Sequence, residues 1–291
     1  MHQIRYHLMA IFVVAAWGTT FVATQLLLDN GLSPRDIFFY RFLLAFVCIC
    51  FFSYGQKFFA DNWKDELTLL LMGVAGGSLY FLLANTALDK TQSSNVALLT
   101  CTAPVFIVLV SFLLVKNREK LGRYFWYGSI LALVGIALVV YSGHAKPKIN
   151  PLGDMLSILA ALSWAFYTIF LKRVSGRYKI LFITRKVFFY GVITLLPLFL
   201  ISPLNLDAEM LAKPVVWGNL LYLGVVASLM CFFLWSLVVK NLGAVRATNY
   251  VYLSPAITMA AGAIIIDETI TAVAIVGAVM ILTGVALTER K

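Results

Sequence analysis

Apolar stretches of 18 or more residues, almost free of charge, recur along the whole chain and are separated by short polar segments. A helix of that length is long enough to cross a hydrocarbon layer about 30 Å thick. The pattern predicts transmembrane helices at residues 8–28, 36–54, 67–87, 92–115, 124–142, 154–171, 180–201, 217–239, 244–266 and 270–288. We therefore expect an all-α integral membrane protein with ten transmembrane helices.

Composition supports the same conclusion. Of the 291 residues, 62% are hydrophobic and 12% are charged, whereas a soluble domain carries roughly 25% charged residues. The longest predicted connection, residues 202–216, is too short for a separate catalytic or regulatory domain. Whatever the protein does is therefore expected to take place within the membrane.

The 23 lysine and arginine residues indicate how the helices are oriented. Fifteen lie in the termini and loops on the side of the N-terminus, five lie on the opposite side, and three lie inside predicted helices. Because basic residues favour the cytoplasmic side, both termini are expected in the cytoplasm. The basic residues are spread over short loops, so they do not indicate a nucleic-acid partner.

The chain contains an internal repeat with an offset of 149 to 151 residues. The repeated pairs are Ser78 with Ser228, Pro104 with Pro255, Gly128 with Gly277 and Gly135 with Gly284. The predicted halves are residues 1–145 and 146–291, each with five helices. Because five is an odd number, the second half must cross the membrane in the opposite sense, which predicts an inverted repeat of the kind that serves alternating access in transporters.

With this repeat, the chain resembles the drug/metabolite transporter superfamily, and within it the EamA type of ten-helix carrier. In the first half the resemblance lies in Trp17-Gly18-Thr19-Thr20-Phe21, the segment from Pro34 to Arg41, Ala97-Leu98-Leu99 through Pro104, and Glu119 with Gly128 and Gly135. In the second half it lies in Ser163-Trp164-Ala165, Pro255, Glu268, Gly277 and Gly284. The resemblance implies two inverted five-helix bundles around a central cavity lined by the first, third, fourth, sixth, eighth and ninth helices, in a protein that moves small organic metabolites. Together with the predicted topology, it also implies a location in the inner membrane.

Two prolines mark where the cavity is expected. Pro104 and Pro255 each follow a polar run, which includes Thr100 in one helix and Asn249 and Tyr250 in the other. A proline frees backbone carbonyls, which are tolerated in a membrane only where protein or a water-filled cavity satisfies them. The alternative is a kink packed between helices without contact to substrate.

Several polar or amphipathic side chains are predicted well inside their helices, although tryptophan and tyrosine usually gather at the membrane interfaces. Rings with a polar atom at that depth need hydrogen-bond partners and suit a planar or aromatic solute. Ordinary helix packing is the alternative for each of them. The predicted substrate-binding residues are Trp17, Thr20, Tyr80, Asn85, Thr100, Trp164, Tyr167, Trp235, Asn249 and Tyr250.

Two arginines lie about one turn into their predicted helices. Arg41 is expected near the outer face and Arg185 near the inner face, both shallow enough to reach toward lipid headgroups. They are candidates for a gate or for binding a substrate carboxylate, or they simply tie loops together. Pro34 precedes Arg41, but no proline precedes Arg185, and Lys186 adds a second charge, which argues against equivalent roles.

Other chemistry is not indicated by the sequence. All 13 carboxylates fall in predicted loops or at helix ends, whereas proton-driven carriers commonly place one at mid-membrane. This favours facilitated transport or exchange. There is no phosphate-binding glycine loop and no paired-histidine metal motif, so we expect no cofactor, no bound metal and no catalytic residue.

The sequence therefore predicts a carrier, not an enzyme, that exports or exchanges small organic metabolites such as amino acids or aromatic compounds. A passive channel or an integral membrane enzyme is the alternative from another class, and a nucleotide-sugar or lipid-like solute carrier is the alternative within the class. The expected partners are a small-molecule substrate and membrane lipids. A functional monomer is expected because both halves lie on one chain.

Overall fold

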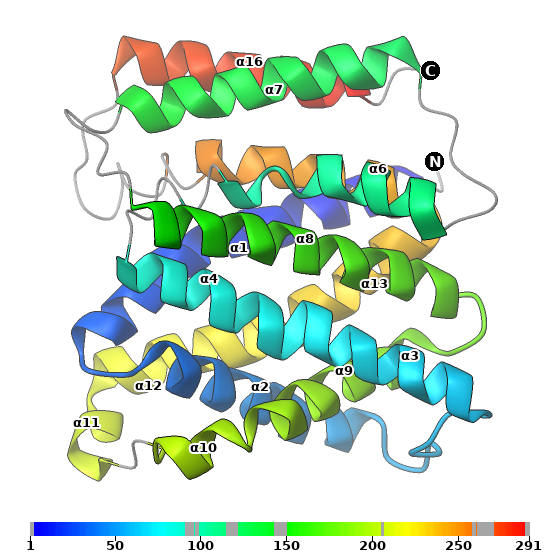
Figure 1. The fold of residues 1–291 in the computed structure, drawn as a ribbon, viewed down its shortest axis with the longest axis vertical. Helices are drawn as coiled ribbons and strands as arrows, with labels where there is room; N and C mark the ends of the chain where they lie inside the picture. The colour runs from blue at the N-terminus through cyan, green and yellow to red at the C-terminus, as the bar shows by residue number, and fades with distance from the viewer. Residues whose placement is uncertain are drawn as a thin grey trace.

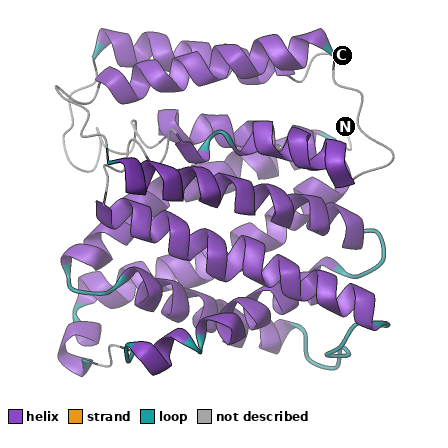
Figure 2. Cartoon of the chain, viewed as in Figure 1, coloured by secondary structure: helices purple, strands orange, loops and turns teal. Residues whose placement is uncertain are grey.

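A computed structural model describes residues 3–90, 96, 99–114, 122–142, 150–204, 207–257, 260 and 271–288. Within those residues the secondary structure is helical throughout and contains no β-strand, as Figure 2 shows. The prediction of an all-α protein is confirmed. Of the residues that carry the family resemblance, Ala97, Leu98, Glu119 and Glu268 lie outside the described residues.

Figure 1 shows the described helices in chain order from blue to red. Those of the first half are α1 (Ile4–Asp29), α2 (Pro34–Phe52), α3 (Trp63–Gly73), the π-helix η1 (Val74–Ser78), α4 (Leu79–Lys90), α6 (Ala103–Leu114) and α7 (Arg123–Ser142). Those of the second half are α8 (Pro151–Val174), α9 (Ile180–Leu195), α10 (Leu198–Ile201), α11 (Ala208–Ala212), α12 (Pro214–Leu221), the π-helix η2 (Tyr222–Met230), α13 (Cys231–Leu242), α14 (Ala244–Asn249), the 3-10 helix η3 (Tyr250–Leu253) and α16 (Ala272–Thr288).

Helical residues occur in each of the ten predicted ranges, of which 92–115, 244–266 and 270–288 fall partly outside the described residues. Among the described residues, five helical segments have the length and apolar composition needed to cross a membrane. They are Ile4–Asp29, Trp63–Lys90, Pro151–Val174, Ile180–Ile201 and Pro214–Leu242. Large apolar side chains on the outside, such as Phe51, Leu113 and Leu200, are more than three-quarters exposed, as expected of a surface that faces lipid.

Some boundaries differ from the prediction because capping residues lie outside the apolar runs. The third helix begins at Trp63 and not at residue 67, because the Asn62 side chain accepts a hydrogen bond of 2.9 Å from the backbone N–H of Asp65. The helix predicted at 180–201 is interrupted after Leu195, just before Pro197. A proline lacks the N–H that would continue the backbone ladder.

The two π-helices lie at equivalent places of the repeat, and each is held by a side chain from the opposite half. Ser163 of α8 donates to the carbonyl of Ala75 in η1 at 2.7 Å. Trp17 of α1 donates its indole N–H to the carbonyl of Ala227 in η2 at 3.0 Å. A π-helix disturbs the regular ladder and is often found at functional sites. These two bonds connect the halves and fix the positions of Trp17 and of Trp164, which follows Ser163.

The last helices of the two halves, α7 and α16, lie side by side along one edge of the molecule (Figure 1). Their repeated glycines face one another. A Cβ added to Gly128 would lie 2.5 Å from the carbonyl oxygen of Gly284, and one added to Gly135 would lie 2.6 Å from that of Gly277. Small residues allow membrane helices to approach this closely. The fold is thus formed by two inverted repeats.

Candidate functional site

A cavity of about 700 Å³, counting the space toward its mouth, lies in the interior of the protein. Its wall consists of Val14, Trp17, Thr20, Phe21, Arg41, Tyr80, Phe81, Thr100, Cys101, Ala103, Trp164, Phe232, Val251 and Ser254. These residues come from the first, third, fourth, sixth, eighth and ninth predicted helices, and Arg41 adds the second helix.

Aromatic rings make up much of the wall. Trp164 lies at their centre, with ring centroids 5.3 Å from Trp17 at right angles, 5.1 Å from Tyr80 and 5.9 Å from Phe232. Edge-to-face and tilted contacts at such distances are favourable for aromatic pairs. The wall therefore presents fixed, mainly apolar ring surfaces that suit the body of an aromatic or bulky apolar solute.

Arg41 is the charged group of this wall. Its side chain is 2% exposed, its Nε donates to the Ser228 hydroxyl at 2.9 Å, and its guanidinium lies 4.3 Å from the centre of the Phe81 ring. No carboxylate among the described residues forms an ion pair with it. The prediction that Arg41 lies shallow enough to reach the headgroups is wrong. Its α2 starts at Pro34, so Arg41 lies about two turns in, where its side chain turns inward to η2.

The structure brings Trp17, Thr20, Tyr80, Thr100 and Trp164 together in the wall of the cavity. The two prolines flank it as well. Pro104 directly follows the lining residue Ala103, and Pro255 directly follows the lining residue Ser254. In both places the α-helix is interrupted just before the proline, by a turn at residues 101–102 and by η3.

Other residues predicted to bind substrate do not line this cavity. The Asn85 amide donates to the carbonyl of Pro34 at 3.1 Å, and the Tyr250 hydroxyl forms a hydrogen bond with His7 of α1. Asn249 is fully buried, and its amide has no hydrogen-bond partner among the described residues.

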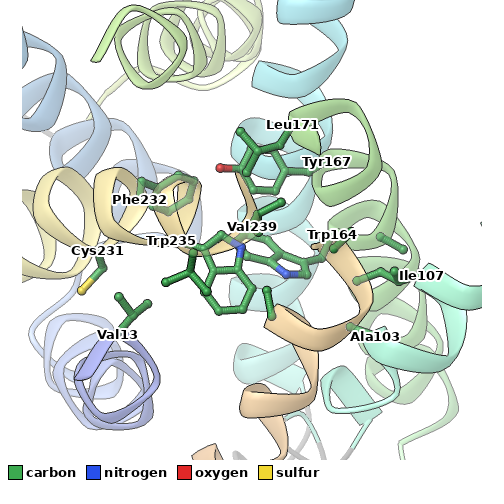
Figure 3. Close-up of a cluster of buried hydrophobic side chains, with 14 of the residues drawn as sticks. Val13, Ala103, Ile107, Trp164, Tyr167, Leu171, Cys231, Phe232, Trp235 and Val239 are labelled. Carbon is green, nitrogen blue, oxygen red and sulfur yellow. The ribbon is translucent and has the colours of Figure 1, made fainter. Parts of the chain in front are cut away.

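Tyr167 and Trp235 lie one turn beyond Trp164 and Phe232 on α8 and α13, and they are packed in the core next to the cavity (Figure 3). The ring of Tyr167 lies 4.9 Å from that of Trp164, and the ring of Trp235 lies 5.1 Å from that of Trp17. These two side chains therefore support the aromatic wall from the side on which α8 and α13 end.

Sequence reasoning did not single out Phe81, Phe232 and Cys101, which also line the cavity. Phenylalanine has no polar atom that would make a deep position unusual, and Cys101 is typical of a small buried hydrophobic residue. The adjacency of Phe81 to Tyr80 was the available signal.

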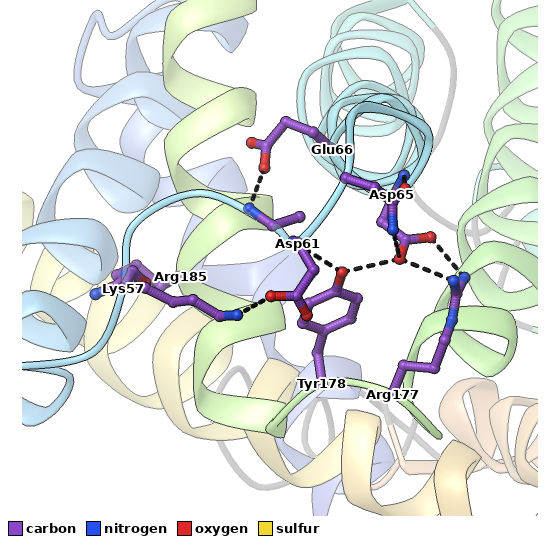
Figure 4. Close-up of polar contacts among 9 residues, drawn as sticks. Lys57, Asp61, Asp65, Glu66, Arg177, Tyr178 and Arg185 are labelled. Carbon is purple, nitrogen blue, oxygen red and sulfur yellow. Dashed lines mark hydrogen bonds and ion pairs between the residues drawn. The ribbon is translucent and has the colours of Figure 1, made fainter.

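A second polar cluster lies at the end of the molecule where α2 leads into α3 (Figure 4). Arg185 of α9 donates to the carbonyl of Ser53 at 3.3 Å, to the Ser53 hydroxyl at 3.1 Å and to the carbonyl of Lys57. Ser53 is the C-cap of α2. Arg185 thus binds the end of a helix and the loop that follows it, away from the cavity wall.

The neighbouring Lys186 is fully buried and forms an ion pair with Glu66 of α3. Glu66 also accepts hydrogen bonds from the Tyr190 hydroxyl and from the backbone N–H of Ala60. The Lys186 ammonium lies 4.4 Å from the centre of the Phe58 ring. A buried cation with a carboxylate partner and aromatic neighbours is a satisfied charge.

An adjacent ion pair connects the same two halves. Arg177, in the loop between α8 and α9, contacts the Asp65 carboxylate at 2.6 Å, and the Tyr178 hydroxyl donates to Asp65 at 2.8 Å. Burial raises the pKa of Tyr178, so its hydroxyl remains a donor near neutral pH. We call Asp65, Glu66, Arg177, Tyr178 and Lys186 the loop network. It joins the start of α3 to α9 and to the loop before α9.

Comparison with known proteins gives a consistent result over the whole chain. The family model described as EamA-like transporter family matches residues 4–141 and again residues 151–290. An uncharacterized transporter, YdfC, from Bacillus subtilis is 27% identical, with 96% of this chain and 89% of the relative covered. A probable amino-acid metabolite efflux pump from Salmonella typhimurium is 28% identical, with 95% and 92% covered.

Two further comparisons extend this picture. A probable terminal-alkyne amino-acid exporter from Streptantibioticus cattleyicolor is 25% identical, with 97% of this chain and 92% of the relative covered. A solved crystal structure has the same fold, with a TM-score of 0.76 at 16% identity, and covers 98% of this chain and 96% of its own.

Proposed function

Since the chain belongs to the EamA-like transporter family and is a multi-pass membrane transporter, we propose that it carries small organic metabolites across the inner membrane by alternating access. The observation that supports this proposal is the cavity between the two halves, lined by aromatic rings and one buried arginine. Such a wall suits a solute that has an apolar or aromatic body and a polar end. We propose efflux or exchange of amino acids and related aromatic compounds.

The names of relatives support this choice of substrate. One relative is named a probable amino-acid metabolite efflux pump and another a probable terminal-alkyne amino-acid exporter. The proposed mechanism is supported by the bonds that Trp17 and Ser163 make to the opposite half. Movement of one half against the other would change access to a site centred on Trp164.

We further propose that both termini are cytoplasmic, as the distribution of basic residues favours. The loop network then lies on the cytoplasmic side, with Tyr167 and Trp235 packed between it and the cavity. In this arrangement the cytoplasmic entrance is closed. Opening it requires the Glu66–Lys186 and Asp65–Arg177 pairs to separate. One chain contains both halves, so the proposed functional unit is a monomer.

Counterflow in proteoliposomes tests the proposal. Radiolabelled amino acids are offered to liposomes preloaded with unlabelled ones, with the wild type compared with Trp164→Ala. The matched control is Trp63→Ala, since Trp63 is 70% exposed at the start of α3 and does not line the cavity. Saturable counterflow that Trp164→Ala weakens and Trp63→Ala leaves intact is the expected result.

Other outcomes distinguish the alternatives. Flux that rises linearly with solute concentration and shows no counterflow would indicate a passive channel. Counterflow that is saturable but unaffected by Trp164→Ala would indicate a carrier whose binding site lies elsewhere. Absence of flux for all amino acids would discard them as substrates and direct the search to other metabolites.

A further inference from the structure

Among the residues that the structure describes, the wall of the cavity carries one formal charge. Arg41 is its cationic residue, and no aspartate or glutamate of the described residues lines it. The parts of the predicted helices at 92–115 and 244–266 that lie outside the described residues contain no aspartate or glutamate in the sequence. The buried guanidinium of Arg41 therefore has neutral neighbours, the Ser228 hydroxyl and the Phe81 ring.

An unpaired buried cation is costly in a low-dielectric environment, and a bound anion reduces that cost. A solute of net charge −1 would make the occupied cavity neutral. A zwitterionic amino acid would bring its own ammonium group, for which the described wall offers no carboxylate, and would leave the cavity with a net positive charge. The electrostatics therefore favour a carboxylate that has no free ammonium group.

The geometry of Arg41 suits a carboxylate. Within the described part of the chain its hydrogen bond is made by Nε, to Ser228, while the two terminal nitrogens of the guanidinium make none. Guanidinium groups bind carboxylates through two parallel N–H donors. The rings of Tyr80, Trp164 and Phe232 line the same cavity and offer a surface for an apolar body.

We infer that this cavity selects organic monoanions, carboxylates with an aromatic or bulky apolar body and no free ammonium group, in preference to zwitterionic amino acids of the same size. Amino-acid derivatives whose amino group has been removed or acylated belong to this class. The inference rests on the proposed function, since it names the substrate class of the same site.

Four probes that share a phenyl group and differ in charge test the inference. They are 3-phenylpropionate with net charge −1, phenylalanine as the zwitterion, 3-phenylpropionamide as the neutral compound and 2-phenylethylamine as the cation. Binding to the purified full-length protein in nanodiscs is measured by the shift in thermal unfolding and by tryptophan fluorescence. We expect 3-phenylpropionate to bind about tenfold more tightly than phenylalanine, and both of the others to bind more weakly still.

Substitutions then assign the preference to one residue. Arg41→Gln is expected to abolish the preference for 3-phenylpropionate over its amide, and Arg41→Lys to retain part of it, because the charge remains but the two-donor geometry is lost. Arg173→Gln removes an exposed arginine and should leave the order of the probes unchanged. If Arg41→Gln does not fold, Arg41→Lys and the wild-type ranking still decide.

Phenylalanine binding as tightly as 3-phenylpropionate, or none of the four probes binding to the wild type, would overturn the inference. A preference that survives in Arg41→Gln would overturn it too. These failures are separate from failure of the transporter proposal. If other solutes show saturable counterflow, the protein is a carrier without this selectivity. If the probes bind in the expected order but flux is only linear, the cavity has the selectivity and the protein is not a carrier.

Discussion

The Nε of Arg41 donates a 2.9 Å hydrogen bond to the hydroxyl of Ser228, which joins α2 of the first half to the π-helix η2 of the second. The repeat-related serine, Ser78 in η1, makes the corresponding bond across the halves at 2.8 Å, but its partner is the hydroxyl of Thr194 in α9. Both halves therefore make a hydrogen bond from this serine to the other half. The partner is a charged guanidinium for Ser228 and a neutral hydroxyl for Ser78. In the described part of the cavity wall, the positive group comes from the first half.

This asymmetry leads to the first prediction. Ser228→Ala removes the acceptor that orients the guanidinium, while the charge of Arg41 remains. Loss of one hydrogen bond to a charged group costs about 1.5–3 kcal/mol at most, so we expect the apparent affinity for an organic monoanion to fall roughly ten- to a hundredfold. Inhibition of counterflow by 3-phenylpropionate measures it. Ser78→Ala breaks the equivalent neutral bond and is the matched control, and an equal effect of both variants would contradict the assignment.

Much of the fold follows from sequence patterns, because the solvent of a membrane protein imposes a simple rule. A membrane helix satisfies the hydrogen-bonding groups of its own backbone, so the apolar runs identify the helices. The offset of Ser78 from Ser228 identifies the repeat. The π-helices could not be predicted. A five-residue hydrogen-bond pattern leaves no mark in composition, and it is established by packing partners such as Ser163 and Trp17 from the other half.

The candidate site was less accessible from the sequence. Trp164 and Tyr167 are both aromatic residues with one polar atom, and they lie one turn apart on α8. Of these two, only Trp164 lines the cavity. The close approach of η1 to α8 determines which of these two rings faces the cavity. A Cβ added to Gly76 of η1 would lie 2.3 Å from the Tyr167 ring, so the glycine makes the space in which that ring is packed. Such contacts between distant segments are not encoded by local pattern.

A second prediction concerns the bond between Trp17 and Ala227. Trp17→Phe keeps an aromatic ring in the cavity wall but leaves the carbonyl of Ala227 without its 3.0 Å donor. Loss of one buried hydrogen bond costs about 0.5–1.5 kcal/mol, so the midpoint of thermal unfolding in detergent should fall. Trp217→Phe changes a half-exposed tryptophan and serves as control. An unchanged midpoint in Trp17→Phe would show that this bond does not support η2.

The third prediction concerns the buried ion pair of the loop network. Lys186→Gln leaves Glu66 without its cation, and Glu66→Gln leaves the fully buried Lys186 without its anion. Breaking a buried pair on one side is destabilising by about 3–5 kcal/mol. We therefore expect both single variants to unfold at lower denaturant concentration than the wild type, with Glu66→Gln affected more, because its remaining charge is the more buried one.

The double variant Lys186→Gln with Glu66→Gln provides the control for that pair. It leaves no uncompensated charge, so its stability should exceed that of Glu66→Gln alone, and the two substitutions should not be additive. Additive losses in the double variant would mean that the two side chains act independently, and the loop network would then lose its role as a connection between the halves.

The fourth prediction concerns the contact between α7 and α16. A Cβ at Gly128 would lie 2.5 Å from the backbone oxygen of Gly284, and neither backbone can move away without separating the helices. Gly128→Ala should therefore destabilise the protein by about 1–3 kcal/mol, as overpacking does elsewhere, although alanine favours a helix more than glycine. Thermal unfolding in detergent, followed by gel filtration, measures the loss.

Gly218→Ala is the matched control for that substitution. Gly218 lies in α12, also within a membrane helix, but a Cβ there would have no heavy atom within 4 Å. Helix propensity alone should then make Gly218→Ala neutral or slightly stabilising. Opposite signs for the two substitutions would show that close approach of α7 and α16 sets the stability of this edge. If Gly128→Ala also proved neutral, the two helices would be free to separate by the width of a methyl group.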